Sequence, residues 1–245
     1  MAMSNIASYA LLSAAVFSGG LISGLAGFAF SAVAGAILLH ILPPIEAVPL
    51  MMACSLPVQA ATLWMLRRNV QWKSSFVLIV GGLLGIPPAV YLLQNVDTWL
   101  FRIGFGVLVA AYAAYMLFRP ALAAFRWTGC RVRNGLIGFG GGLIGGLTAM
   151  PGALPTIWCD LHGMPKNELR GLVQPFIMVM QIFALVLILG RYDLSSKFLL
   201  DLTISLPALA AGTALGFFMF RSVNEAVFRR VILVVLFFSG LSLVV

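Results

Sequence analysis

Long apolar segments separated by short polar ones run through most of the chain. An apolar helix of about 20 residues spans a bilayer, at about 1.5 Å per residue. The segments predict membrane helices over the ranges 46–66, 74–94, 99–118, 168–189, 197–219 and 225–244. Lys and Arg lie mostly between these segments, so we expect an all-α, polytopic transmembrane protein.

The apolar stretch at residues 6–42 is too long for one upright span and contains five glycines. We expect two helical pieces, 6–25 and 28–42, with a break near Gly27. Pro43 ends the second piece, because proline fits the first turn of a helix but not its interior. The stretch is either a bent span or a hairpin that enters the membrane and returns.

The second half of the chain repeats this plan. An offset of 122 residues superposes the Gly-rich motif at 19–25 on the motif at 141–147. A Gly-rich piece over 134–148, a break at 148–155 and a short piece over 153–161 follow the same order. The offset also matches rare residue types, at His40/His162, Pro43/Pro165, Glu46/Glu168 and Gln59/Gln181. Such self-similarity indicates a duplicated fold.

We divide the chain into a first transmembrane repeat (1–118), a cytoplasmic linker (119–133) and a second transmembrane repeat (134–245). If each Gly-rich element re-enters as a hairpin, 12 of the 15 Lys and Arg residues lie on one side of the membrane. If each element crosses once, the split is 9 to 6. The positive-inside bias therefore favours re-entrant hairpins, inverted repeats and both termini outside, with single crossings as the alternative.

Composition excludes several classes of protein. The chain is 62% hydrophobic and 9% charged, against about 25% charged in soluble domains. Its net charge of +8 is interpreted as loop charge that sets orientation, not as a nucleic-acid surface. The three cysteines have no metal-ligand spacing, and no nucleotide-binding or catalytic motif is found. We expect no enzyme activity, cofactor or metal; a homodimer stays open.

The two breaks form the candidate anion site. A helix N-terminus carries unpaired N–H groups and about half a positive charge, so two of them attract an anion without a buried cation. No Lys or Arg lies deep in a span, and hydroxyl and amide side chains lie near the breaks. The candidate substrate-binding residues are Gly27, Phe28, Ser31, Gln59, Met150, Pro151, Gly152, Thr156 and Gln181.

Each of these residues also has a structural interpretation. The glycines can serve close helix packing, and the two glutamines can bond a neighbouring helix. The His40/His162 and Glu46/Glu168 pairs suit capping or loop bonding, with proton coupling as the alternative. Asp201, early in a span, reaches the interface or takes part in a proton relay.

A duplicated module that opens with Gly-Gly-Leu-x-x-Gly-Leu and continues into a Gly/Pro-rich break resembles the TauE/SafE sulfite exporter family of membrane permeases. Residues 141–152 are the closest match, and the resemblance extends from end to end. The first-half segment 27–30 departs from the fuller Gly-rich form of the family. The resemblance implies transport of a small sulfur-containing or organic anion, such as sulfite, sulfoacetate or another sulfonate.

We therefore predict a secondary transporter of the bacterial inner membrane, an exporter that works by alternating access between two inverted repeats. The alternatives are an anion channel and a transporter of another small carboxylate or metal-linked substrate. Proton coupling stays open, as do the identity of the substrate and the direction of transport.

Overall fold

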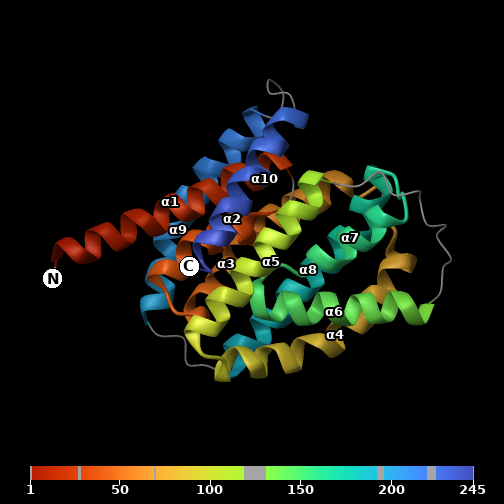
Figure 1. Cartoon of the computed structure of the whole chain (residues 1–245), viewed down its shortest axis with the longest axis horizontal. Coiled ribbons are helices and arrows are strands. Elements are labelled where there is room, and N and C mark those ends of the chain that lie inside the picture. The colour runs from red at the N-terminus through yellow and green to blue at the C-terminus, as the bar shows by residue number, and fades with distance from the viewer. Residues whose placement is uncertain are drawn as a thin grey trace. The chain divides into compact units, whose positions relative to one another are not determined.

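The computed structural model describes residues 2–26, 29–68, 70–118, 131–191, 196–219 and 225–244, and this part of the chain is helical with short turns between helices (Figure 1). The described residues form ten helices: α1 (Ala2–Ala26), α2 (Phe30–Ile41), α3 (Pro44–Leu66), α4 (Trp72–Asn95), α5 (Thr98–Phe118), α6 (Arg131–Thr148), α7 (Ala153–Leu161), α8 (Lys166–Arg191), α9 (Ser196–Met219) and α10 (Glu225–Ser242). The predicted all-α class is confirmed.

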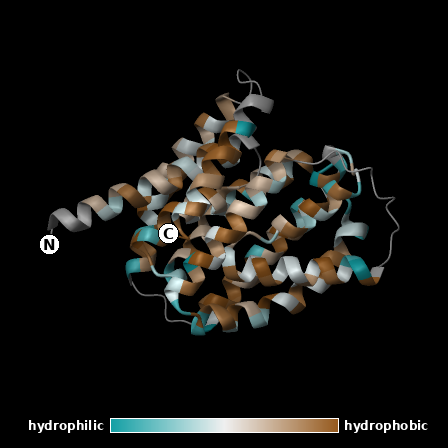
Figure 2. Cartoon of the chain, viewed as in Figure 1, coloured by the Kyte–Doolittle hydropathy of each residue, from teal (hydrophilic) through white to brown (hydrophobic). Residues whose placement is uncertain are grey.

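Six of these helices are long and apolar enough to cross a membrane, namely the ones that contain Ala7–Gly24, Pro44–Leu66, Trp72–Asn95, Thr98–Phe118, Glu168–Arg191 and Lys197–Met219. Apolar residues cover most of their length, and the hydrophilic ones collect toward helix ends (Figure 2). Two shorter apolar segments lie at Phe30–Ile41 and Arg230–Ser242. The protein is therefore an integral, multi-pass membrane protein.

Both Gly-rich elements are interrupted. α1 ends at Ala26 and α2 begins at Phe30, while α6 ends at Thr148 and α7 begins at Ala153. Ala29 (φ 76°) and Ala149 (φ 58°) adopt the left-handed conformation, which costs a non-glycine residue about 1–2 kcal/mol. The chain reverses at the first break, because Gly19 of α1 lies against Phe30 and Ala34 of α2.

The chain forms two compact units. Unit 1 comprises Met1–Val58, Val96–Pro120 and Asp193–Val245, and unit 2 comprises Gln59–Asn95 and Ala121–Tyr192. Each unit thus combines residues from both sequence halves. Unit 1 packs α1 of the first half against α9 of the second, and unit 2 packs α4 of the first half against α6 of the second. Most of the expected linker, 119–130, lies outside the described residues, and residues 131–133 begin α6.

Glycine allows the two main helix pairs to approach closely. In unit 2, a Cβ atom at Gly138 would overlap the main-chain carbonyl of Leu78, and one at Gly142 would overlap that of Gly82. Because both partner positions advance by four residues, α4 and α6 run parallel. In unit 1, Gly212 and Gly216 of α9 meet the carbonyl groups of α1 in the same way, so α1 and α9 are also parallel. The packing role proposed for glycine accounts for these positions.

The fifth helices of the two halves, α5 and α10, pack together inside unit 1. They cross at Gly106 and Gly240, each of which would place a Cβ against the carbonyl oxygen of the other. Gly106 also faces Val244, whereas Gly240 also faces Ala110. A higher residue number on α5 therefore faces a lower residue number on α10, and the two helices are antiparallel.

Candidate functional site

The second break, in unit 2, leaves main-chain N–H groups at the start of α7. The N–H of Ala153 donates to the carbonyl oxygen of Met150 (3.2 Å), and the N–H of Thr156 donates to that of Gly152 (3.0 Å). Pro155 has no N–H. Among the described residues we find no main-chain partner for the N–H groups of Gly152 and Leu154. These two donors lie where the helix dipole concentrates its positive end.

Gln181 of α8 forms a hydrogen bond to the second break. Its Nε2 donates to the main-chain carbonyl oxygen of Ala149 (3.3 Å), the residue in the left-handed conformation. The side chain is 2% exposed, and its Oε1 has no hydrogen-bond partner among the described residues. The open Oε1 is an acceptor and suits a donor such as water, whereas the second hydrogen of Nε2 is the one that could be donated to an anion.

Gln59, the repeat counterpart of Gln181, has a different partner. Its Oε1 accepts a hydrogen bond from Nε2 of Gln174 on α8, and both side chains are buried. This matches the interpretation that Gln59 bonds a neighbouring helix. Sequence reasoning missed Gln174, because the 122-residue offset pairs it with Met52 and gives no matching type. A buried polar residue inside an apolar span was the available signal.

The other candidates of the second break are packed within unit 2. A Cβ at Gly145 would meet Pro151, and one at Gly152 would meet the side chain of Ile177 on α8. Met150 and Pro151 are buried, and Thr156 is partly buried in the first turn of α7. Gly152 is therefore needed for close packing of α7 on α8, as well as being placed at the helix start.

The first break lies in unit 1. Ser31 is buried (4% exposed) in the first turn of α2. Ala29 is the N-cap residue, makes no side-chain cap bond, and accepts the N–H of Val33 at 3.1 Å. The predicted site residues Gly27 and Phe28 lie outside the described residues. Ser31 is thus placed next to a helix start, as expected from the sequence.

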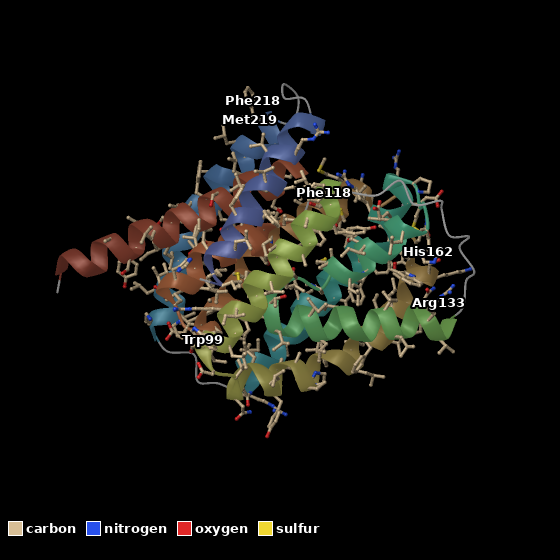
Figure 3. All side chains as sticks on the ribbon, viewed as in Figure 1. Trp99, Phe118, Arg133, His162, Phe218 and Met219 are labelled. Atoms are coloured by element: carbon tan, nitrogen blue, oxygen red, sulfur yellow. The ribbon has the colours of Figure 1, made fainter. Side chains whose placement is uncertain are left out.

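The far end of α7 carries an aromatic and basic stack (Figure 3). The guanidinium carbon of Arg133 lies 5.2 Å from the centre of the Trp158 ring, which lies 4.2 Å from the His162 ring. Nδ1 of His162 is 2.8 Å from the main-chain carbonyl oxygen of Trp158. His162 therefore bonds a carbonyl at the C-terminal end of α7, which agrees with the capping role.

The second break combines main-chain N–H groups at the start of α7 with a buried amide on α8 that binds the residue before α7. No Lys or Arg is present in α7 or in the adjoining break. Oriented main-chain dipoles at a helix N-terminus favour negative charge. Among the described residues, no group of three His, Cys, Asp or Glu side chains could hold a metal ion.

Comparison with known proteins gives one positive result. A family model described as "Sulfite exporter TauE/SafE" matches residues 11–243. No curated protein and no solved structure matches the chain.

Proposed function

Because the chain belongs to the TauE/SafE sulfite exporter family, we propose that it is a secondary transporter that exports sulfite, sulfoacetate or another small sulfonate across the bacterial inner membrane. The family consists of membrane transporters of sulfite and related anions, and not of enzymes. The specific substrate, the alternating-access mechanism and the inner-membrane location are proposals that go beyond membership of the family.

One observation carries the proposal: the start of α7 offers the N–H groups of Gly152 and Leu154, and the buried amide of Gln181 binds Ala149 in the break just before them. A sulfite or sulfonate group presents several acceptor oxygens, which match several convergent donors. Because these donors are dipoles and not full charges, the anion is held without a permanent ion pair, which suits release on the other side.

We further propose that the two sequence halves are inverted repeats, each with a break that offers donors to an anion. The antiparallel pair of fifth helices, α5 and α10, supports the inversion, because direct repeats would make equivalent helices parallel. Ser31 and Thr156 would then add hydroxyl donors from either break. Inverted repeats with interrupted helices are the architecture with which many secondary transporters achieve alternating access.

Flux into liposomes that contain the purified protein tests the proposal. We expect sulfite uptake to saturate with concentration and to show counterflow, which is accelerated entry of labelled sulfite against unlabelled sulfite inside. An ohmic current without counterflow would favour the anion channel. If small carboxylates are taken up while sulfite and sulfonates are not, the protein is better described as a carboxylate transporter.

A further inference from the structure

In unit 1, two polar side-chain contacts join α3 to α9. Nζ of Lys197 lies 2.7 Å from Oε2 of Glu46, and the Cys54 thiol is hydrogen-bonded to the side chain of Ser205. Both contacts advance by eight residues, so the two helices run parallel here. Positions 197, 201 and 205 lie on one face of α9, because residues four apart share a face. That face therefore also presents Asp201 to α3.

Asp201 is 4% exposed, although it lies one turn inside a candidate membrane span. The Ser205 hydroxyl donates to its main-chain carbonyl oxygen (2.7 Å), but the carboxyl group itself has no hydrogen-bond or ion-pair partner among the described residues. On α3, the position between Glu46 and Cys54 on the same face is Leu50, which is 1% exposed. A buried carboxylate without a partner is unfavourable unless it gains a proton or a counterion.

The nearest counterion is already bound elsewhere. Lys197 interacts electrostatically with Glu46, with Asp201 and with Tyr9 of α1, and its hydrogen bond goes to Glu46. Among the groups that interact with this ammonium are therefore two carboxyl groups. The Lys197 and Glu46 side chains are 52% and 40% exposed, so the ammonium has room to move. Asp201 is four residues further on the same helix, which is within reach of a lysine side chain.

We propose that Asp201, Lys197 and Glu46 form a proton-binding site that controls the ion pair between Glu46 of α3 and Lys197 of α9. While Lys197 is bound to Glu46, Asp201 takes up one proton from water and is neutral. When that proton leaves, Lys197 turns to the Asp201 carboxylate, and its bond to Glu46 is broken. Uptake of one proton thus changes the charge of the three groups by one and restores the contact between the helices.

The site belongs to one half only. When the starts of α4 and α9 are aligned, Trp72 with Ser196, Lys73 corresponds to Lys197 but Val77 corresponds to Asp201. A single titrating carboxyl fits one proton moved per transport cycle. The coupling of this proton to transport rests on the proposed function, whereas the proton site itself does not.

Infrared difference spectroscopy of the purified protein in lipid nanodiscs, recorded as the pH is stepped, tests the proton site without any substrate. We expect a protonated-carboxyl band that Asp201→Asn removes and that Glu168→Gln, the repeat counterpart of Glu46, leaves unchanged. Glu46→Gln frees Lys197 for Asp201, so the midpoint of the band should fall by about one pH unit or more. A band that survives Asp201→Asn, or a midpoint that Glu46→Gln does not lower, would overturn the proposal.

A transport measurement then tests coupling. In liposomes, Asp201→Asn should abolish sulfite uptake driven by a pH gradient but keep sulfite counterflow within about twofold of wild type, because counterflow needs no net proton movement. Loss of both activities, or retention of both, would overturn the coupling role. If the wild-type protein moves no sulfite at all, the proposed function fails, and the infrared titration still decides the proton site.

Discussion

The side-chain amide of Gln181 donates to the main-chain carbonyl oxygen of Ala149 over 3.3 Å, and so joins α8 to the residue at which the second Gly-rich hairpin is interrupted. Ala149 is in the left-handed conformation, which alanine adopts only when its surroundings hold it there. The bond therefore positions the N-terminal end of α7.

Replacing this amide should weaken transport. We expect Gln181→Met to lower saturable sulfite flux by about tenfold, since one lost hydrogen bond of about 1–1.5 kcal/mol corresponds to a factor of about ten. The neighbouring substitution Ile182→Met changes an exposed side chain of the same helix and is the control. Equal flux in the two variants would show that the amide does not position the site.

The Gln59 and Gln174 pair should matter for stability more than for transport. Gln174→Leu leaves the buried Oε1 of Gln59 without its donor, which costs about 1–3 kcal/mol. The double variant Gln59→Leu/Gln174→Leu removes both polar groups and should recover much of that loss. Thermal unfolding in detergent measures the difference, and a double variant less stable than Gln174→Leu would contradict this account.

The glycine contacts between α4 and α6 should tolerate no side chain. Gly138→Ala places a methyl group against the carbonyl of Leu78 and should destabilise the protein by about 1–3 kcal/mol. Gly135→Ala lies in the same helix with open space around the new methyl group, so it should be neutral or stabilising. Thermal unfolding of both variants is the measurement; similar melting temperatures would argue against close packing here.

The inverted arrangement predicts that both termini are outside the cytoplasm. A C-terminal alkaline phosphatase fusion, which is active only outside the cytoplasm, should be active. A C-terminal fluorescent reporter that matures only inside should stay dark. The opposite pattern would place the C-terminus in the cytoplasm and remove the inverted topology.

The sequence by itself determined the membrane class, the helices and the two interruptions. Apolar length is a local property, and glycine and proline act on the backbone within a few residues, so the helix limits predicted near Pro43 and at 148–155 agree with α2, α3, α6 and α7. The internal repeat also placed Gln59 and Gln181 at matching positions inside two spans.

Only the tertiary structure decided which elements pack together. The packing of α1 on α9 and of α4 on α6 joins helices that are separated in the chain by other helices, and it depends on which glycine faces which carbonyl. Likewise, Gln59 meets Gln174 and Gln181 meets Ala149, although the sequence makes the two glutamines equivalent. A hydrogen bond between distant residues depends on helix rotation and register, which no local pattern encodes, and for this reason the partners of both glutamines appeared only in the folded chain.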